Sequence, residues 1–174
     1  MFGLELVAKL VKILASEESP NQIAMGFAMG MIIGFTPFWA VHNLLLILLI
    51  IVLRVNIASA MLGYVVFGLL AYPLDGLFHA FGFYLLVDAA WLHGFWQSVN
   101  QIPIFALSRY NNTVMVGSLV SGLILFVPVF FLFKAFVGYY RRKLHPKFQK
   151  LKIVQLFKAS KFYAIYQKVK FVGE

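Results

Sequence analysis

The chain has 174 residues, of which 62% are hydrophobic and 12% are charged, and its mean hydropathy is +0.87. Soluble domains carry about a quarter charged residues, so this composition excludes that class and predicts one integral membrane domain. The sequence contains no cysteine, which excludes disulfides, thiolate catalysis and cysteine metal sites.

The net charge of +9 is unevenly distributed, because 11 of the 15 Lys and Arg residues lie from Lys134 onward. Cations concentrate in cytoplasmic segments of membrane proteins, so we expect a cytoplasmic C-terminus. Residues 146–174 predict a basic amphipathic helix that lies on anionic lipid. The alternative is a helix that binds a partner protein. We expect no nucleic-acid binding. The residues expected at the membrane surface are Arg141, Arg142, Lys143, Lys147 and Lys150.

Near the N-terminus, residues 2–15 place apolar and charged side chains on opposite faces, which predicts an amphipathic helix at the membrane surface. Ser19 or Asn21 is expected to cap the following helix, with Pro20 in its first turn.

Residues 23–53 form an apolar run without a formal charge. Crossing a bilayer takes about 20 residues, so one straight span does not explain 31. Pro37 lacks an N–H and disfavours helical geometry at Thr36, which predicts two short helices, residues 23–35 and 38–53. They form either a hairpin of short tilted spans or a re-entrant hairpin with its tip at membrane depth.

Both arms of this hairpin carry candidate binding residues. Three glycines four residues apart lie on one face of the first arm, where they serve either tight helix packing or a smooth groove for lipid. Arg54 ends the second arm, where it either snorkels to head groups or binds a lipid phosphate. The lipid or phosphate candidates are Gly26, Gly30, Gly34, Thr36, Pro37, His42, Arg54 and Asn56.

Residues 57–87 predict a second helical unit, broken at Tyr72–Gly76 around Pro73. Two successive Pro-broken units are a feature of transporters. Asp75 and His79 lie four residues apart and share a helix face as a polar pair, which the adjacent turn would place near water. A zinc site that adds His42 to this pair is an unspecific alternative.

Residues 88–112 are too polar to span a membrane and too apolar for a free linker. Their aromatic and polar side chains predict an interfacial segment, which we place in the periplasm, where it could meet a partner. The partner-binding candidates are Trp91, Trp96, Arg109 and Asn112. Asn112 is also expected to cap a transmembrane helix over residues 113–134, with a kink at Pro128.

Four segments of the first half resemble one known family: Ser19-Pro20, Ile23 to Gly30, Ile33 to Pro37 and Leu53 to Asn56. They are similar to the bacterial inner-membrane family called domain of unknown function 2062. Arg109 to Val114 resembles a narrower branch, which is often encoded beside a larger envelope protein. The resemblance implies an inner-membrane location and that partner, but no established chemistry. Phe38-Trp39 departs from the small residues of many relatives, which argues against a narrow open groove there.

The sequence therefore predicts an all-α membrane bundle, residues 1–145, followed by the basic tail 146–174. No local catalytic motif is present, so we expect neither enzymatic activity nor a cofactor nor a bound metal. The leading hypothesis is passage or flipping of a phospholipid or polyprenyl phosphate, with a larger envelope partner. The alternatives are a structural anchor or assembly subunit and a transporter of ions or small solutes. Membrane lipids are expected partners in each case, and a homo-oligomer is compatible with all three.

Overall fold

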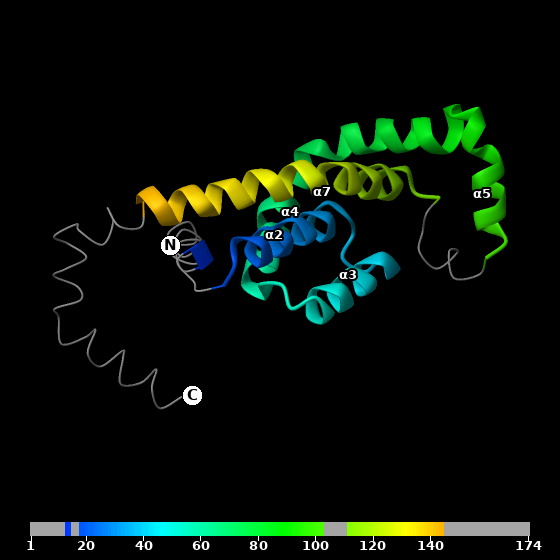
Figure 1. Cartoon of the computed structure of the whole chain (residues 1–174). Coiled ribbons are helices and arrows are strands. Elements are labelled where there is room, and N and C mark those ends of the chain that lie inside the picture. The colour runs from blue at the N-terminus through cyan, green and yellow to red at the C-terminus, as the bar shows by residue number, and fades with distance from the viewer. Residues whose placement is uncertain (1–12, 15–17, 103–110, 145–174) are drawn as a thin grey trace, which may run out of the picture.

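The computed structural model describes residues 13–14, 18–102 and 111–144. Within these ranges the chain is helical, which confirms the predicted all-α class (Figure 1). The expected basic tail and all but the last residues of the expected N-terminal helix lie outside them. The α-helices are α2 Pro20–Phe35, α3 Val41–Val52, α4 Ile57–Phe83, α5 His93–Asn100 and α7 Thr113–Tyr139. Shorter turns are π-helical at Tyr84–Asp88 and Tyr140–Leu144 and 3₁₀ at Ala90–Leu92.

Helix α2 ends at Phe35 as predicted and begins at Pro20, three residues before the predicted start, after Ser19, one of the two expected caps. The Ser19 hydroxyl accepts a hydrogen bond from the Gln22 amide at 3.2 Å, and the Gln22 side chain accepts one from the Ser19 amide at 3.1 Å. This reciprocal pair satisfies two backbone donors, and Pro20 occupies the first turn. At the other end Thr36 is extended, as a residue before proline prefers, so the helix stops before Pro37.

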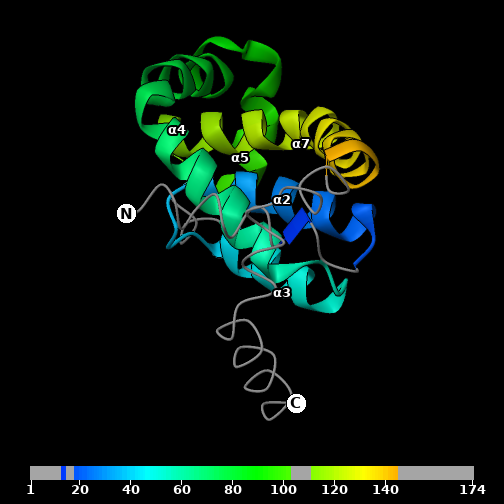
Figure 2. The same ribbon diagram turned by 90° about the vertical axis from the view of Figure 1, so that its left-hand side faces the viewer.

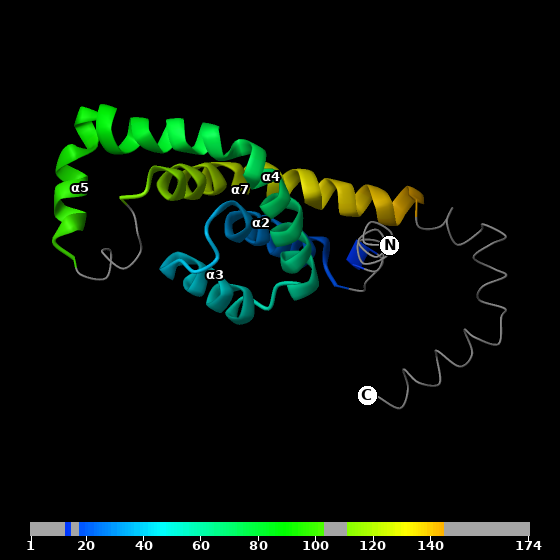
Figure 3. The ribbon, with the colours of Figure 1, turned by 180° about the vertical axis from the view of Figure 1, so that it is seen from behind.

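Helix α2 is the buried centre of the molecule. Twelve of its sixteen residues are buried, although an apolar helix of this kind could equally have faced lipid. Figure 2 shows α2 against α4 and α7, and Figures 1 and 3 show α3 on the side of α2 that faces away from α7. The rings of Phe27 and Phe133 stack at 3.7 Å between centroids, which joins α2 to α7.

Helix α3 packs through one narrow stripe. Asn43, Leu46 and Ile50 lie on one face at helical spacing, and Ile50 is buried against Met29 and Ile33 of α2. The other faces of α3 are apolar and exposed, as Leu44 with 69% exposure illustrates. The second arm of the predicted hairpin is therefore present, and most of its surface is uncovered by the rest of the described chain.

Helix α4 corrects one expectation. The chain does not leave the helix at Tyr72–Gly76, because α4 continues through Pro73. Pro73 removes one hydrogen bond and crowds the preceding turn, which accounts for the bend that Figure 1 shows midway along α4. The helix persists because Ala71 and Phe78, on either side of the proline, pack in the same cluster. The second Pro-broken unit is therefore one bent helix and not two.

The chain returns through α5 to the long helix α7. Asn112 caps α7 as predicted, since its side-chain oxygen accepts a hydrogen bond from the Met115 amide at 3.1 Å. The helix predicted over residues 113–134 is present and extends to Tyr139, with Pro128 inside it. Helix α7 and the bent α4, each with its π-helical turn, are long and apolar enough to cross a membrane.

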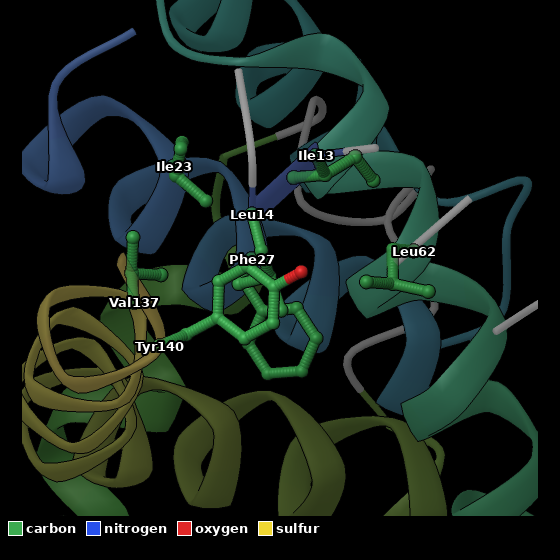
Figure 4. Packing of buried hydrophobic residues seen from close by; sticks show 7 residues of the cluster. All are labelled: Ile13, Leu14, Ile23, Phe27, Leu62, Val137 and Tyr140. Carbon is green, nitrogen blue, oxygen red and sulfur yellow. The ribbon is translucent and has the colours of Figure 1, made fainter. Parts of the chain in front are cut away.

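The end of the N-terminal segment docks at the end of α7. Ile13 and Leu14 are buried in one cluster with Ile23, Val137 and Tyr140 (Figure 4). The Arg141 Nε atom donates a hydrogen bond to the Leu14 carbonyl at 2.9 Å. Arg141 was expected at the membrane surface; in the structure it also holds together two segments that are 127 residues apart.

Candidate functional site

The predicted lipid candidates fall into three separate places on the α2–α3 hairpin. Thr36, Pro37 and His42 lie at the tip between the two helices. Arg54 and Asn56 lie at the opposite end of α3, about 18 Å away for a twelve-residue helix. The three glycines lie on the inner face of α2. The candidates therefore do not form one site.

The glycine face is packed against α4. A Cβ atom at Gly30 would overlap with the backbone of Ala60 in α4, and one at Gly34 would lie 2.7 Å from the Tyr64 carbonyl oxygen. These glycines allow two helix backbones to approach closely, which confirms the packing interpretation. The lipid-groove interpretation of Gly26, Gly30 and Gly34 is wrong, because the α4 backbone fills that face.

The hairpin tip is held by Asn43, which sequence reasoning missed. Its amide nitrogen donates hydrogen bonds to the carbonyls of Pro37 at 2.9 Å and Phe38 at 3.3 Å. Its oxygen lies 3.1 Å from the Thr36 hydroxyl, which also lies 2.9 Å from the Ile32 carbonyl. Asn43 is only 1% exposed. A lone amide within a long uncharged run was the available signal, because such a group needs partners when it is buried.

The aromatic residues of the tip face outward. Trp39 is 92% exposed, and its ring contacts that of Phe38 in a T-shaped arrangement at 5.3 Å between centroids. Phe38 also contacts Tyr64 of α4 at 5.8 Å. His42, one residue before Asn43, has two buried ring nitrogens without a hydrogen-bond partner in the described chain. The tip therefore presents large apolar rings outward over the hydrogen bonds of Asn43, while the His42 ring nitrogens have no partner among the described residues.

The turn after α3 is the second place. Arg54 has a φ of 49°, a conformation that few residues other than glycine and asparagine adopt readily. Its carbonyl accepts a hydrogen bond from the Gln22 side chain at 3.3 Å. The Arg54 side chain is exposed, and the structure gives its guanidinium no hydrogen bond to the described residues. A charged group with five donors is thus available to a ligand.

Asn56 has a structural role at this turn. Its side chain caps α4 by accepting a hydrogen bond from the Ser59 amide, and it is buried. Ser59 in turn donates to the Ile23 carbonyl of α2 at 2.7 Å. Neither α2 nor α4 has an acidic residue in its first turn. The partial positive charges of both helix starts lie near Arg54, where the Ser19 and Asn56 side-chain caps satisfy part of the free backbone amides.

Asp75 and His79 lie four residues apart on the continuous helix α4, so they share a face as predicted, but they are not joined by an ion pair. Asp75 and His79 are both exposed, but His79 Nδ1 lies 2.6 Å from the Thr113 hydroxyl at the start of α7. In the part of the chain that the structure describes, no three metal-ligating side chains gather. His79 therefore joins α4 to α7, and the zinc alternative has no cluster to support it.

The α5 region carries the partner-binding candidates. Trp91 is 76% exposed, whereas Trp96 is held by a hydrogen bond from its indole nitrogen to the Leu85 carbonyl at 2.9 Å. Phe95 beside it is exposed, with its ring 5.0 Å from that of Trp96. Arg109 lies outside the described residues. Asn112 contributes a helix cap, as shown above.

These features define an all-α protein with two helices long and apolar enough to span a membrane. Residues 6–145 match the family described as "Uncharacterized protein conserved in bacteria (DUF2062)", and the chain belongs to it. The chain is also similar to an "Uncharacterized protein" of Treponema pallidum (strain Nichols), with 26% identity over 138 residues. That alignment covers 79% of this chain and 85% of the relative. No solved structure matches the chain.

Proposed function

We propose that this protein handles lipid in the bacterial inner membrane without enzymatic activity, passing or flipping a phospholipid or polyprenyl phosphate. The single observation that carries this function is α3, a helix with ten apolar residues among its twelve that is exposed on most sides. Two residues beyond it lies Arg54, whose side chain is exposed and has no hydrogen-bond partner among the described residues. The apolar face suits the hydrocarbon chains of such a lipid, and a cation beside it suits the phosphate head group.

The membrane location is supported by what α4 and α7 expose. Only 22% of the apolar window of each helix is buried. A core helix of a soluble protein would bury most of such a window, and neither helix lies near the N-terminus as a signal sequence would. Exposed residues such as Leu69, Leu132 and Ile124 extend this apolar surface along both helices. Lipid chains are the partner that covers it at least cost.

Helix α3 is too short to cross the membrane. Twelve residues extend about 18 Å, whereas the hydrocarbon core is about 30 Å thick. A helix of this length leaves one end within the bilayer or thins the bilayer around it. Either outcome lowers the free-energy barrier for a polar head group to cross the hydrocarbon core beside the helix. Such a lowered barrier is what a protein that moves lipid requires.

Arg54 supplies the head-group contact. A guanidinium can hold a phosphate through two parallel hydrogen bonds. The nearby starts of α2 and α4 add partial positive charge without acidic side chains in their first turns to cancel it.

Substituting Arg54 tests this function. Arg54→Asn removes the charge at little backbone cost because asparagine tolerates positive φ. We expect it to weaken binding of phosphatidic acid and to slow transfer of a fluorescent phospholipid between liposomes by about fivefold, or roughly 1 kcal/mol at an exposed site. Arg54→Lys should retain part of both activities. The measurements are flotation with vesicles that contain phosphatidic acid and fluorescence transfer from reconstituted protein.

Arg142→Asn is the matched control. It removes one exposed positive charge whose Nε atom donates only to Gly138 in the preceding turn. Equal effects of the two variants, or wild-type transfer no faster than empty liposomes, would count against lipid handling at Arg54.

A structural anchor is the second candidate function, and two exposed aromatic residues favour it, one in the 3₁₀ turn before α5 and one in α5. Trp91 and Phe95 project from a segment whose position is fixed through Trp96. We expect Trp91→Ala with Phe95→Ala to reduce co-purification with the larger envelope protein that the family resemblance implies. Tyr72→Ala, at an equally exposed aromatic position in α4, is the control. Retention of the partner by the double variant would contradict docking at α5.

The geometry gives the transporter alternative less support. That hypothesis depended on two Pro-broken helices, and α4 is continuous through Pro73. Asp75 and His79, which would couple transport to ions, are exposed and not joined to each other.

A further inference from the structure

Given the membrane location proposed above, we infer that the α2–α3 hairpin is re-entrant: it enters and leaves the bilayer on the cytoplasmic side, which also carries Leu14 and the end of α7. Its tip ends within the bilayer.

The directions of the helices provide the first step. Along α2, Gly26 faces Asn56 and Ala60, and Gly34 faces Tyr64 and Gly68. The contacting residue numbers increase along both helices, so α2 and the first half of α4 run in the same direction. The intervening α3 must therefore return the chain to the level at which α2 began.

Hydrogen bonds confirm that this return is complete. The Asn56 amide donates to the Gln22 carbonyl at 3.3 Å, and the Gln22 side chain donates to the Arg54 carbonyl at 3.3 Å. The hydroxyl of Ser59 donates to the Ile23 carbonyl at 2.7 Å. The start of α2, the end of α3 and the start of α4 thus share one level.

The same level holds the ends of the described chain. Ile23 is buried with Leu14 and Val137, and Arg141 donates to the Leu14 carbonyl. The chain segments near residues 14, 22, 54 and 141 therefore lie on one side of the membrane. Between residues 14 and 141 the number of crossings is even, and α4 with α7 supplies two.

The opposite end belongs to α5. A Cβ at Gly82 would meet Thr113, and one at Gly117 would meet Phe78, so the second half of α4 and the start of α7 are antiparallel. Figure 1 shows α5 beyond this end of α4, on the side away from the end of α7. Next to the tip, the Phe35 ring lies 5.1 Å from that of Phe78, which faces Gly117 of α7. The hairpin is nevertheless too short to span the bilayer, since the twelve residues of α3 extend about 18 Å against a hydrocarbon core of about 30 Å.

Charge assigns the sides. Between Asn56 and Phe133 the sequence contains one cation, Arg109, and the other Lys and Arg residues precede or follow that range. The shared level, with Arg54 and the Arg141–Lys143 cluster, is therefore cytoplasmic.

The tip also has the chemistry that membrane depth requires. Irregular backbone survives there only when its polar groups are satisfied by protein. Asn43 satisfies the carbonyls of Pro37 and Phe38, while Trp39 presents its ring outward.

Single cysteines in this cysteine-free chain test the topology. Glu18→Cys, Ala58→Cys and Lys143→Cys replace exposed residues at the shared level, Gln97→Cys lies in α5, and Trp39→Cys lies at the tip. A membrane-impermeant maleimide is applied to spheroplasts and to inverted inner-membrane vesicles. We expect the first three to react only in inverted vesicles, Gln97→Cys only in spheroplasts, and Trp39→Cys in neither until detergent is added.

Each variant should remain in carbonate-washed membranes in wild-type amount. Reaction of Glu18→Cys and Ala58→Cys from different sides, or of Trp39→Cys before detergent, would overturn the re-entrant hairpin. Reversed labelling of all positions would overturn the cytoplasmic assignment, and extraction by carbonate would overturn the membrane location. The labelling pattern is independent of lipid transfer, so failure of the Arg54 experiment leaves it intact.

Discussion

Gly30→Ala is expected to lower the free energy of unfolding by about 1–3 kcal/mol, the usual cost of overpacking a core. The added Cβ would overlap with the Ala60 carbonyl group, and the Tyr64 amide lies close behind it. These are backbone atoms, which cannot rotate away, so α2 and α4 must separate. Since α2 is the buried centre, that separation also loosens its contact with α7. Thermal unfolding of the protein in detergent micelles, followed by circular dichroism, measures the change.

Gly76→Ala is the matched control in α4. A Cβ at Gly76 would meet nothing within 4 Å, so only the better helix propensity of alanine remains. That term should leave stability unchanged or raise it by up to about 1 kcal/mol. A Gly30→Ala variant as stable as Gly76→Ala would mean that α2 and α4 are not in backbone contact.

Asn43→Leu is expected to destabilise the protein by about 2–4 kcal/mol. The carbonyls of Pro37 and Phe38 and the buried Thr36 hydroxyl each lose a hydrogen bond to Asn43, and a hydrogen bond contributes about 0.5–1.5 kcal/mol. Leucine has a similar volume, so the loss is one of hydrogen bonds more than of packing. The expected signs are a lower unfolding temperature and faster proteolysis between α2 and α3.

Leu44→Ala controls for general truncation of α3, because Leu44 is exposed and belongs to none of the buried clusters. It should shift stability by a few tenths of a kcal/mol in a micelle. If Asn43→Leu unfolded at the wild-type temperature, the tip would not depend on the Asn43 hydrogen bonds.

Much of the helix pattern was predictable because its signals are local. The Ser19 cap, the stop at Thr36 before proline and the Asn112 cap each depend on residues within one turn. The glycine spacing in α2 also predicted a packing face, since small residues four apart align on any helix.

The outcome at Pro73 could not be predicted locally. Pro37 and Pro73 both interrupt apolar runs, yet the helix ends before Pro37 and continues through Pro73. Residues on both sides of Pro73 pack in the same cluster with Phe35, and this packing offsets the lost hydrogen bond. Propensity gives no information about that cluster, which forms from residues far apart in sequence.

The candidate site was only partly predictable for the same reason. Arg54 was identified from its position at the end of an apolar run, and in the structure its side chain is exposed and has no hydrogen bond to the described residues. The glycines were assigned to the same site because they are near in sequence. In the structure α4 covers them, and the length of α3 separates Arg54 from Thr36 and His42.

By itself, the sequence determined the membrane-like composition, the family, the break at Thr36-Pro37 and the caps of the helices, because these depend on hydropathy and on contacts within one turn. Only the tertiary structure decided that α2 is a buried centre, that its glycines contact α4 and that α3 returns to the level of Leu14 and Arg141. Those features depend on which helix backbones pack against each other. Hydropathy does not predict this packing, because an apolar residue is equally suited to contact lipid or another helix.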